Sequence, residues 1–103
     1  MKIQMSRKIA SADTLETGIA NKTGILGVSY TTALGVHHSA VYALYDSAGT
    51  PTTVLLAGNG TQFTITETTA SKVNVYWKTN EVEIENNSGA EIQITLEGDF
   101  YNV

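Results

Sequence analysis

The 103-residue chain contains no cysteine, which excludes disulfide bonds, thiolate metal ligands and a cysteine nucleophile. It has one proline, and charged residues make up 16% of it, a low share for a freely soluble monomer. No long apolar run follows Met1–Lys8, so we expect neither a signal peptide nor a membrane-spanning segment. Six basic residues against ten acidic ones give a net charge of −4, which argues against nucleic acid as a partner.

Residues that could carry catalysis or bind a metal ion are also scarce. The two histidines, His37 and His38, are adjacent, and neighbours in an extended segment point to opposite faces. The chain has no Gly-x-Ser-x-Gly elbow, phosphate-binding loop or dinucleotide fingerprint. A chain this short also leaves little room for a walled cleft. We therefore expect no enzyme activity, no metal site and no cofactor.

Threonine is abundant, with fifteen residues, many of them in runs with Val, Ile and Tyr. β-Branched and aromatic side chains favour strands, and no window longer than ten residues keeps an apolar stripe at helical spacing. The sequence predicts an all-β fold, a single-domain antiparallel β-sandwich, jelly-roll-like or immunoglobulin-like, of about seven or eight strands. Residues 1–12 would form a basic N-terminal arm or edge strand, and residues 13–103 the sandwich domain.

The dipeptide Asn59-Gly60 favours a two-residue type I′ turn. In that register Leu56 faces Phe63, so apolar side chains meet on one side of the ribbon only. Val54 then faces Ile65 on the same ribbon. We therefore expect the segments on either side of this turn to form a hairpin.

A three-stranded meander is predicted further along the chain. A turn at Thr79–Asn80 pairs Val75 with Ile84. A three-residue loop at 87–89, with Gly89 in the left-handed conformation, would then place Ile84 opposite Ile92. The shared inner face holds these apolar residues: Val73, Val75, Trp77, Val82, Ile84, Ile92, Ile94 and Leu96.

The outer face of the same meander is rich in acidic residues. In the predicted register Glu85 lies opposite Glu91, which is mildly unfavourable. One interpretation is a solvated face that charge protects from aggregation; the alternative is a docking surface for a basic partner. The face comprises Asn74, Tyr76, Lys78, Glu81, Glu83, Glu85, Glu91, Gln93, Thr95 and Glu97.

Charge is distributed unevenly between the two ends of the chain. Residues 1–12 hold Lys2, Arg7 and Lys8 and no acid, whereas residues 80–103 hold six acidic residues and no base. This asymmetry favours an N-terminal strand near the acidic sheet, within the subunit or across to a neighbour. Exposed ion pairs contribute about 0–1 kcal/mol each, so charge would steer the arm without holding it.

The segment 39–45 is apolar on both of its alternating faces, which is unusual for a strand of an antiparallel sandwich. Either a loop or another subunit must cover the second face, and tyrosine, which is enriched at interfaces, favours the subunit. One face holds Ala40, Tyr42 and Leu44, and the other holds Val41, Ala43 and Tyr45.

Two sequence segments carry a resemblance to a known class of protein. They are GILGVSYTTA at residues 24–33 and SAVYALYDSAGT at residues 39–50, followed by a Val/Leu strand and a Gly-rich turn. Over roughly residues 22–101 this layout resembles small virion structural proteins of tailed bacteriophages. The resemblance implies a compact β-sandwich with a cement, decoration, fibre or connector role on a capsid or tail, and it transfers no site residues.

The sequence therefore favours a structural virion protein, made in the host cytoplasm, that self-associates and docks on the major capsid protein or another virion protein. A trimer or larger closed ring is the kind of homo-oligomer expected on a shell, with neither nucleic acid nor membrane as a partner. The competing hypothesis is a carbohydrate- or receptor-binding module whose tyrosine rings stack on sugars. The expected protein-interface residues are Lys2, Arg7, Lys8, Val41, Tyr42, Tyr45, Glu83 and Glu91.

Overall fold

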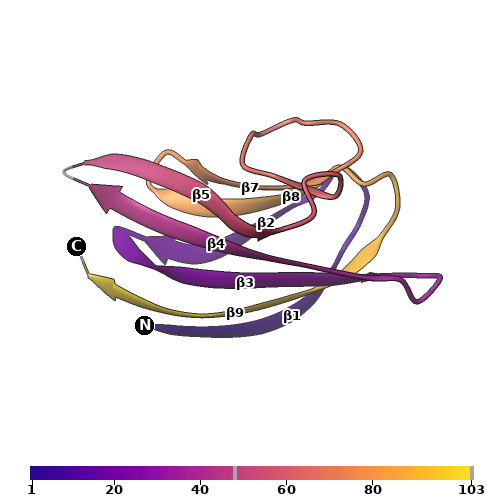
Figure 1. Ribbon diagram of the computed structural model, residues 1–103, viewed down its shortest axis with the longest axis horizontal. Helices are drawn as coiled ribbons and strands as arrows, with labels where there is room; N and C mark the ends of the chain where they lie inside the picture. Colours follow the sequence, from indigo (N-terminus) through magenta and orange to yellow (C-terminus); the bar gives the residue numbers. More distant parts are fainter. Residues whose placement is uncertain (48, 103) are drawn as a thin grey trace.

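The computed structural model describes residues 1–47 and 49–102, which form nine strands in two packed sheets (Figure 1). Residues 48 and 103, parts of the predicted 39–50 segment and sandwich domain, lie outside the described residues. The predicted all-β sandwich is confirmed. The strands are β1 (Lys2–Ile9), β2 (Thr14–Ala20), β3 (Lys22–Thr32), β4 (His37–Ser47), β5 (Thr50–Gly58), β6 (Phe63–Thr64), β7 (Val73–Lys78), β8 (Glu81–Asn86) and β9 (Ile92–Asn102).

One sheet has five antiparallel strands in the order β1-β9-β3-β4-β5. Its long central strands, β9, β3 and β4, have eleven residues each. The N-terminal strand β1 is an edge strand that pairs with β9 along its whole length, from Lys2 opposite Asp99 to Ile9 opposite Ile92. The basic start of the chain thus lies beside acidic β9 within the same subunit, as its charge suggested.

The second sheet has four strands in the order β2-β8-β7-β6. Its short edge strand β6 runs parallel to β7, whereas the other pairs are antiparallel. The loop at residues 65–72 folds back over this sheet and appears in Figure 1 as the large salmon loop beyond β7 and β8. The loop therefore covers the outer side of β7 and part of β8, whereas β2 keeps exposed side chains there.

The core lies between the inner faces of the two sheets. All eight apolar residues predicted for an inner face do point inward, and seven of them are fully buried. The Phe100 ring needs two inward-facing glycines, because a Cβ on Gly24 would come within 2.6 Å of it and one on Gly98 within 3.0 Å. At the far side of the core the Trp77 indole N–H donates a hydrogen bond to the Thr52 carbonyl at 3.0 Å and links the sheets.

The hairpin predicted at Asn59-Gly60 is wrong. Strand β5 ends at Gly58 and belongs to the five-stranded sheet, whereas Phe63 begins β6 in the other sheet. The connection is a wider turn in which the Asn59 carbonyl accepts from the N–H of Phe63 at 3.1 Å and its side chain accepts from the N–H of Thr61 at 2.8 Å. Alternating apolar residues can meet either between paired strands of one hairpin or between strands of two facing sheets. Alternation alone therefore does not distinguish these arrangements.

The predicted meander is half right. The turn at Thr79–Asn80 is confirmed, because Val75 pairs with Ile84 and Lys78 with Glu81. The loop at 87–89 instead crosses from β8 to β9 in the other sheet, although Gly89 does adopt a positive φ of 94°. Inner residues of β8 therefore face those of β9 across the core and do not pair with them, and Glu85 lies opposite Asn74 and Thr14, not opposite Glu91.

A fully buried residue, Asn86, bonds to both segments that cross from one sheet to the other at this corner, residues 10–13 and 87–91. The Asn86 side-chain amide shares its N–H groups among the carbonyl oxygens of Ile9, Ala10 and Ala90, at 2.9, 3.2 and 2.8 Å. Its side-chain oxygen accepts from the Ser88 N–H at 3.1 Å. The Asn86 side chain thus ties the end of β1 to the start of β9.

The Asn86 backbone is bonded to the same corner of the molecule. The Ala12 N–H donates to the Asn86 carbonyl at 2.7 Å, and the Asn86 N–H donates to the Asp13 carbonyl at 2.9 Å. Both the 10–13 and the 87–91 connections are therefore held by one residue, which we call the Asn86 clamp.

Replacing Asn86 by Ala leaves three buried or part-buried carbonyl oxygens without their donor and should lower the free energy of unfolding by about 3 kcal/mol. Urea unfolding followed by circular dichroism measures this change. The matched control is Asn102→Ala, because the Asn102 side chain is exposed and accepts one bond, from Lys22. A loss for Asn86→Ala no larger than that for the control would contradict the clamp.

Candidate functional site

Among the described residues, no loop covers the outer face of the five-stranded sheet. Along β4, Ala40, Tyr42 and Leu44 point inward and are buried. The intervening side chains point outward, and Val41 and Tyr45 are 36% and 37% exposed. The strand that the sequence marked as apolar on both faces therefore buries one face in the core and presents the other to solvent.

Neighbouring strands extend this apolar surface across the sheet. Ile25 on β3 lies opposite Ala43 on β4, and Ala43 lies opposite Val54 on β5. Ile25 is 49% exposed, Val54 is 37% exposed, and Tyr101 at the end of β9 is 68% exposed. We call this surface the outer patch; it consists of Ile25, Val41, Ala43, Tyr45, Val54 and Tyr101.

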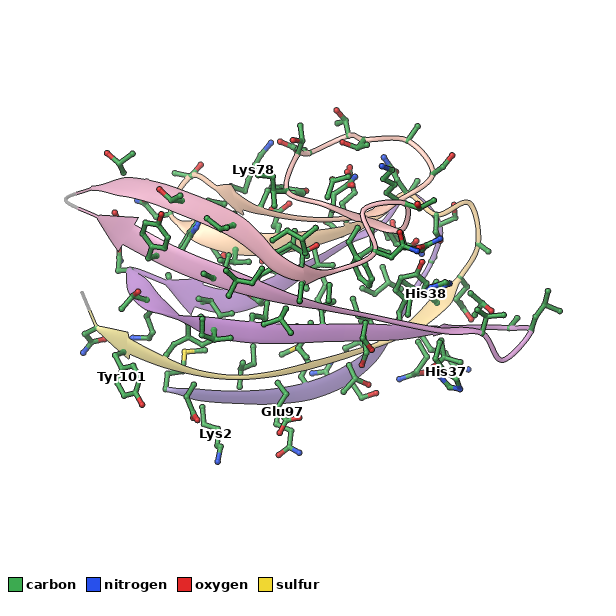
Figure 2. All side chains as sticks on the ribbon, in the orientation of Figure 1. Lys2, His37, His38, Lys78, Glu97 and Tyr101 are labelled. Atoms are coloured by element: carbon green, nitrogen blue, oxygen red, sulfur yellow. The ribbon has the colours of Figure 1, made fainter. Side chains whose placement is uncertain are left out.

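A shallow groove of about 510 Å³ runs through the outer patch. Its floor includes Gly27, which has no side chain and lies between Glu97 and Val41 in the register. Carboxylates of Glu97 and Asp99 stand on one side of it. Figure 2 shows Lys2, Glu97 and Tyr101 projecting from the same side of the sheet, away from β7 and β8.

The other half of the same face is polar. Four hydroxyl side chains lie in one row across four strands, because Ser6 pairs with Thr95, Thr95 with Ser29 and Ser29 with Ser39. The Gln93 side chain donates to the Ser6 hydroxyl at 2.6 Å. The outer face is thus apolar toward the end of β9 and hydrogen-bonding toward its start.

The three basic residues predicted for the interface lie on β1 but do not share one direction. Lys2 and Lys8 fall on the outer face, opposite Asp99 and Gln93 of β9. Arg7 alternates with them and lies at the open edge, where its guanidinium donates to the neighbouring Ser6 carbonyl at 3.1 Å. Lys2 therefore borders the outer patch, Lys8 lies in the polar half of the same face, and Arg7 lies on neither.

Tyr42 cannot act as an interface residue, which corrects the prediction. Its ring is fully buried on the inner face, and its hydroxyl donates to the Thr64 carbonyl at 3.1 Å. Burial raises the pKa of this phenol well above its ordinary value. The alternating pattern did place Tyr42 and Val41 on opposite faces, but it did not tell which face was the core.

The acidic residues do not form one face, so that interpretation is also wrong. Glu83 and Glu85 belong to the four-stranded sheet, whereas Glu91 and Glu97 lie beside or on β9 of the five-stranded sheet. The residues of the first group are bonded within the chain. Glu85 accepts from the Thr68 N–H at 2.8 Å, and Glu83 accepts from the Tyr76 hydroxyl at 3.1 Å.

The 65–72 loop covers the outer side of β7 in the four-stranded sheet. Asn74 is fully buried although it points to the outer side, and its amide donates to the Thr69 carbonyl at 3.0 Å. Glu67 and Lys78 form an ion pair of 2.8 Å at the rim of the loop. Burial and the bond to Glu83 raise the pKa of the Tyr76 phenol beneath the loop.

The two histidines lie apart from the outer patch, near the β3–β4 turn (Figure 2). His37 is bonded to the Thr31 hydroxyl at 2.8 Å, and the His38 ring packs on Tyr30 with centroids 5.0 Å apart. Within residues 1–47 and 49–102, no three His, Cys, Asp or Glu side chains are grouped so as to share a metal ion. The same residues include no helix long and apolar enough to cross a membrane.

Comparisons with known proteins do not assign a function to this surface. No family model matches the chain, and no curated protein matches it. Among solved structures it is similar to the tailspike protein of Acinetobacter phage vB_ApiP_P1, with a TM-score of 0.41 and 17% identity over 98% of this chain. The chain spans 21% of the length of that tailspike. A likeness of this degree assigns no function, so function must be argued from the surface itself.

Substitution of adjacent residues of β4 should change the free energy of unfolding by very different amounts. Tyr42→Ala removes a buried ring and a buried hydrogen bond and should lower the free energy of unfolding by about 3 kcal/mol or more. Val41→Thr keeps a β-branched side chain on the exposed face and should change it by less than about 0.5 kcal/mol. Chemical denaturation of both variants in dilute solution measures the difference. Equal losses would mean that Val41 belongs to the core.

Proposed function

We propose that this chain is a structural virion protein that assembles by self-association through the outer patch and docks on a neighbouring capsid or tail protein. The observation that carries the proposal is the difference between the two outer faces. The 65–72 loop covers β7 and part of β8 in the four-stranded sheet, whereas the described residues provide no such cover for the outer patch. Contiguous exposed apolar surface of this kind marks interaction sites.

The size of the outer face suits a second copy of the chain. Strand spacing of about 4.8 Å and a two-residue repeat of about 6.7 Å give a face of five strands and five rows an area of roughly 800 Å². A stable protein interface buries about 800 Å² on each partner. The apolar residues of the face, including Tyr45, gather toward the end of β9 with Lys2 beside them, and Lys8 lies in the polar half. Apolar surface that adjoins polar surface is the composition found in protein interfaces.

A role in a virion extends the proposal beyond self-association. The segments at 24–33 and 39–50 that resemble small phage virion proteins include most of β3 and β4, which form the middle of the outer face. Lys2 and Lys8 on edge strand β1 would steer an acidic region of a neighbouring virion protein toward that edge. Copies made in the host cytoplasm would then assemble on the particle as a trimer or larger ring.

Self-association is tested by a pair of substitutions matched in chemistry and exposure. Ile25 in the outer patch is 49% exposed, and Ile65 beside the four-stranded sheet is 44% exposed. Light scattering coupled to size exclusion should show an oligomer for the unmodified chain, a monomer for Ile25→Lys and an oligomer for Ile65→Lys. A buried lysine at the interface should weaken association by about tenfold or more. A monomeric unmodified chain, or equal masses for the two variants, would contradict the proposal.

Carbohydrate binding is the second candidate function, and the groove gives it specific support. Tyr101 is 68% exposed and shares the groove with Glu97 and Asp99. An exposed ring can stack on a sugar face while carboxylates accept bonds from its hydroxyl groups. A glycan module would keep this groove open, whereas an assembly protein would close it.

Calorimetry with simple saccharides tests this second candidate. If the groove binds sugar, Tyr101→Phe should retain binding through its ring, and Tyr101→Ala should weaken it by about fivefold, since one aromatic contact contributes on the order of 1 kcal/mol. Asp99→Asn reports the carboxylate contribution separately. Absence of heat with every saccharide on a glycan panel would remove this candidate.

A further inference from the structure

A second exposed apolar element lies at one end of the molecule. The turn between β3 and β4 extends beyond the rest of the sandwich (Figure 1). Leu34 in this turn is 92% exposed, the largest value among the exposed large hydrophobic residues described, and Val36 is 48% exposed. We call residues 33–36 the hairpin tip. Burial of a Leu side chain is favourable, and the isolated chain does not bury this one.

The hairpin tip is held in one conformation by its own backbone. The Gly35 N–H donates to the Thr32 carbonyl at 2.9 Å, and the Thr32 N–H donates to the Val36 carbonyl at 2.9 Å. The Thr32 hydroxyl also accepts from the Val36 N–H at 3.2 Å. Gly35 has a φ of 80°, a conformation that glycine adopts without strain. An ordered turn loses little further conformational entropy when it binds.

The groove in the outer patch has the chemistry that this tip requires. Its apolar side chains are Ile25, Val41 and Tyr101, three glycines leave its surface open, and Glu97 and Asp99 complete the lining. Its volume of about 510 Å³ is large enough for a short turn whose Leu side chain contacts the apolar part. The tip and the groove also lie toward opposite ends of the molecule, whose longest dimension is 41 Å. In Figure 2 Tyr101 is near one end and His37, at the base of the hairpin tip, is near the other.

We infer that the hairpin tip of one copy inserts into the groove of a second copy. The inference rests on the proposed self-association and states which two surfaces meet. Because the two surfaces are different, the contact is heterologous, and each copy keeps a free tip at one end and a free groove at the other. Such contacts form a closed ring when the rotation between copies closes, and a filament when it does not.

A mixing experiment with two variants tests this mode of contact. Leu34→Lys has an intact groove and a charged tip, whereas Ile25→Lys has an intact tip and a charged groove. Each variant alone should be monomeric. An equal mixture should form a complex of two chains, because one intact tip meets one intact groove and the remaining surfaces cannot extend the chain. Native mass spectrometry with one variant isotopically labelled reads the composition of the complex.

Controls separate this inference from the proposed function. Leu34→Met keeps an apolar tip and should assemble like the unmodified chain, as should Ile65→Lys. If Leu34→Lys assembles normally while Ile25→Lys is monomeric, self-association stands and the tip is excluded. If both variants are monomeric and their mixture is too, a symmetric face-to-face contact replaces the head-to-tail one. A monomeric unmodified chain would overturn the proposed function itself.

Discussion

The fold depends on hydrogen bonds of Asn86 at the corner where the chain crosses twice between the sheets. The buried Asn86 amide satisfies carbonyl oxygens of both crossing segments, at Ile9, Ala10 and Ala90. These crossings place β1 and β9 in one sheet and β2 and β8 in the other. Without buried bonds at that corner, polar backbone would be left unpaired between two apolar layers, which costs more than the bonds themselves contribute.

The two crossings leave the sheets with different surroundings. The four-stranded sheet lies under the 65–72 loop, where Asn74 and Glu85 bond to loop backbone. The five-stranded sheet is wider, and its central strands β3 and β4 carry apolar side chains on both faces. One set fills the core, and the other forms the outer patch. The same sequence feature that makes β4 a good core strand therefore also supplies a surface suited to assembly.

The sequence predicts which residues of a strand point inward better than it predicts which strands pair with each other. Alternation identified the inner residues of β7, β8 and β9 and the turn at 79–80, because period-two patterning and turn chemistry are local. It failed at Asn59-Gly60 and at 87–89, where pairing along a ribbon and packing across a core give the same alternation.

The candidate site was predicted in part for the same reason. Val41 and Tyr45 were identified from the apolar pattern of β4, whereas Ile25, Val54 and the hairpin tip at Leu34 were missed. Ile25 alternates with inward-facing Leu26 and so carried a usable signal, but Leu34 lies in a turn, where periodicity gives none. Glu83 was wrongly grouped with Glu91 because that grouping depended on the incorrect strand pairing.

Self-association through the outer patch is tested most directly by hydroxyl-radical footprinting of the unmodified chain at low and high concentration, read by peptide mass spectrometry. Assembly through the outer patch predicts that oxidation of Tyr45 and Tyr101 falls as concentration rises, while oxidation of Ile65 stays constant. Unchanged oxidation of both tyrosines in a sample that scattering shows to be associated, or protection centred on Ile65, would contradict it.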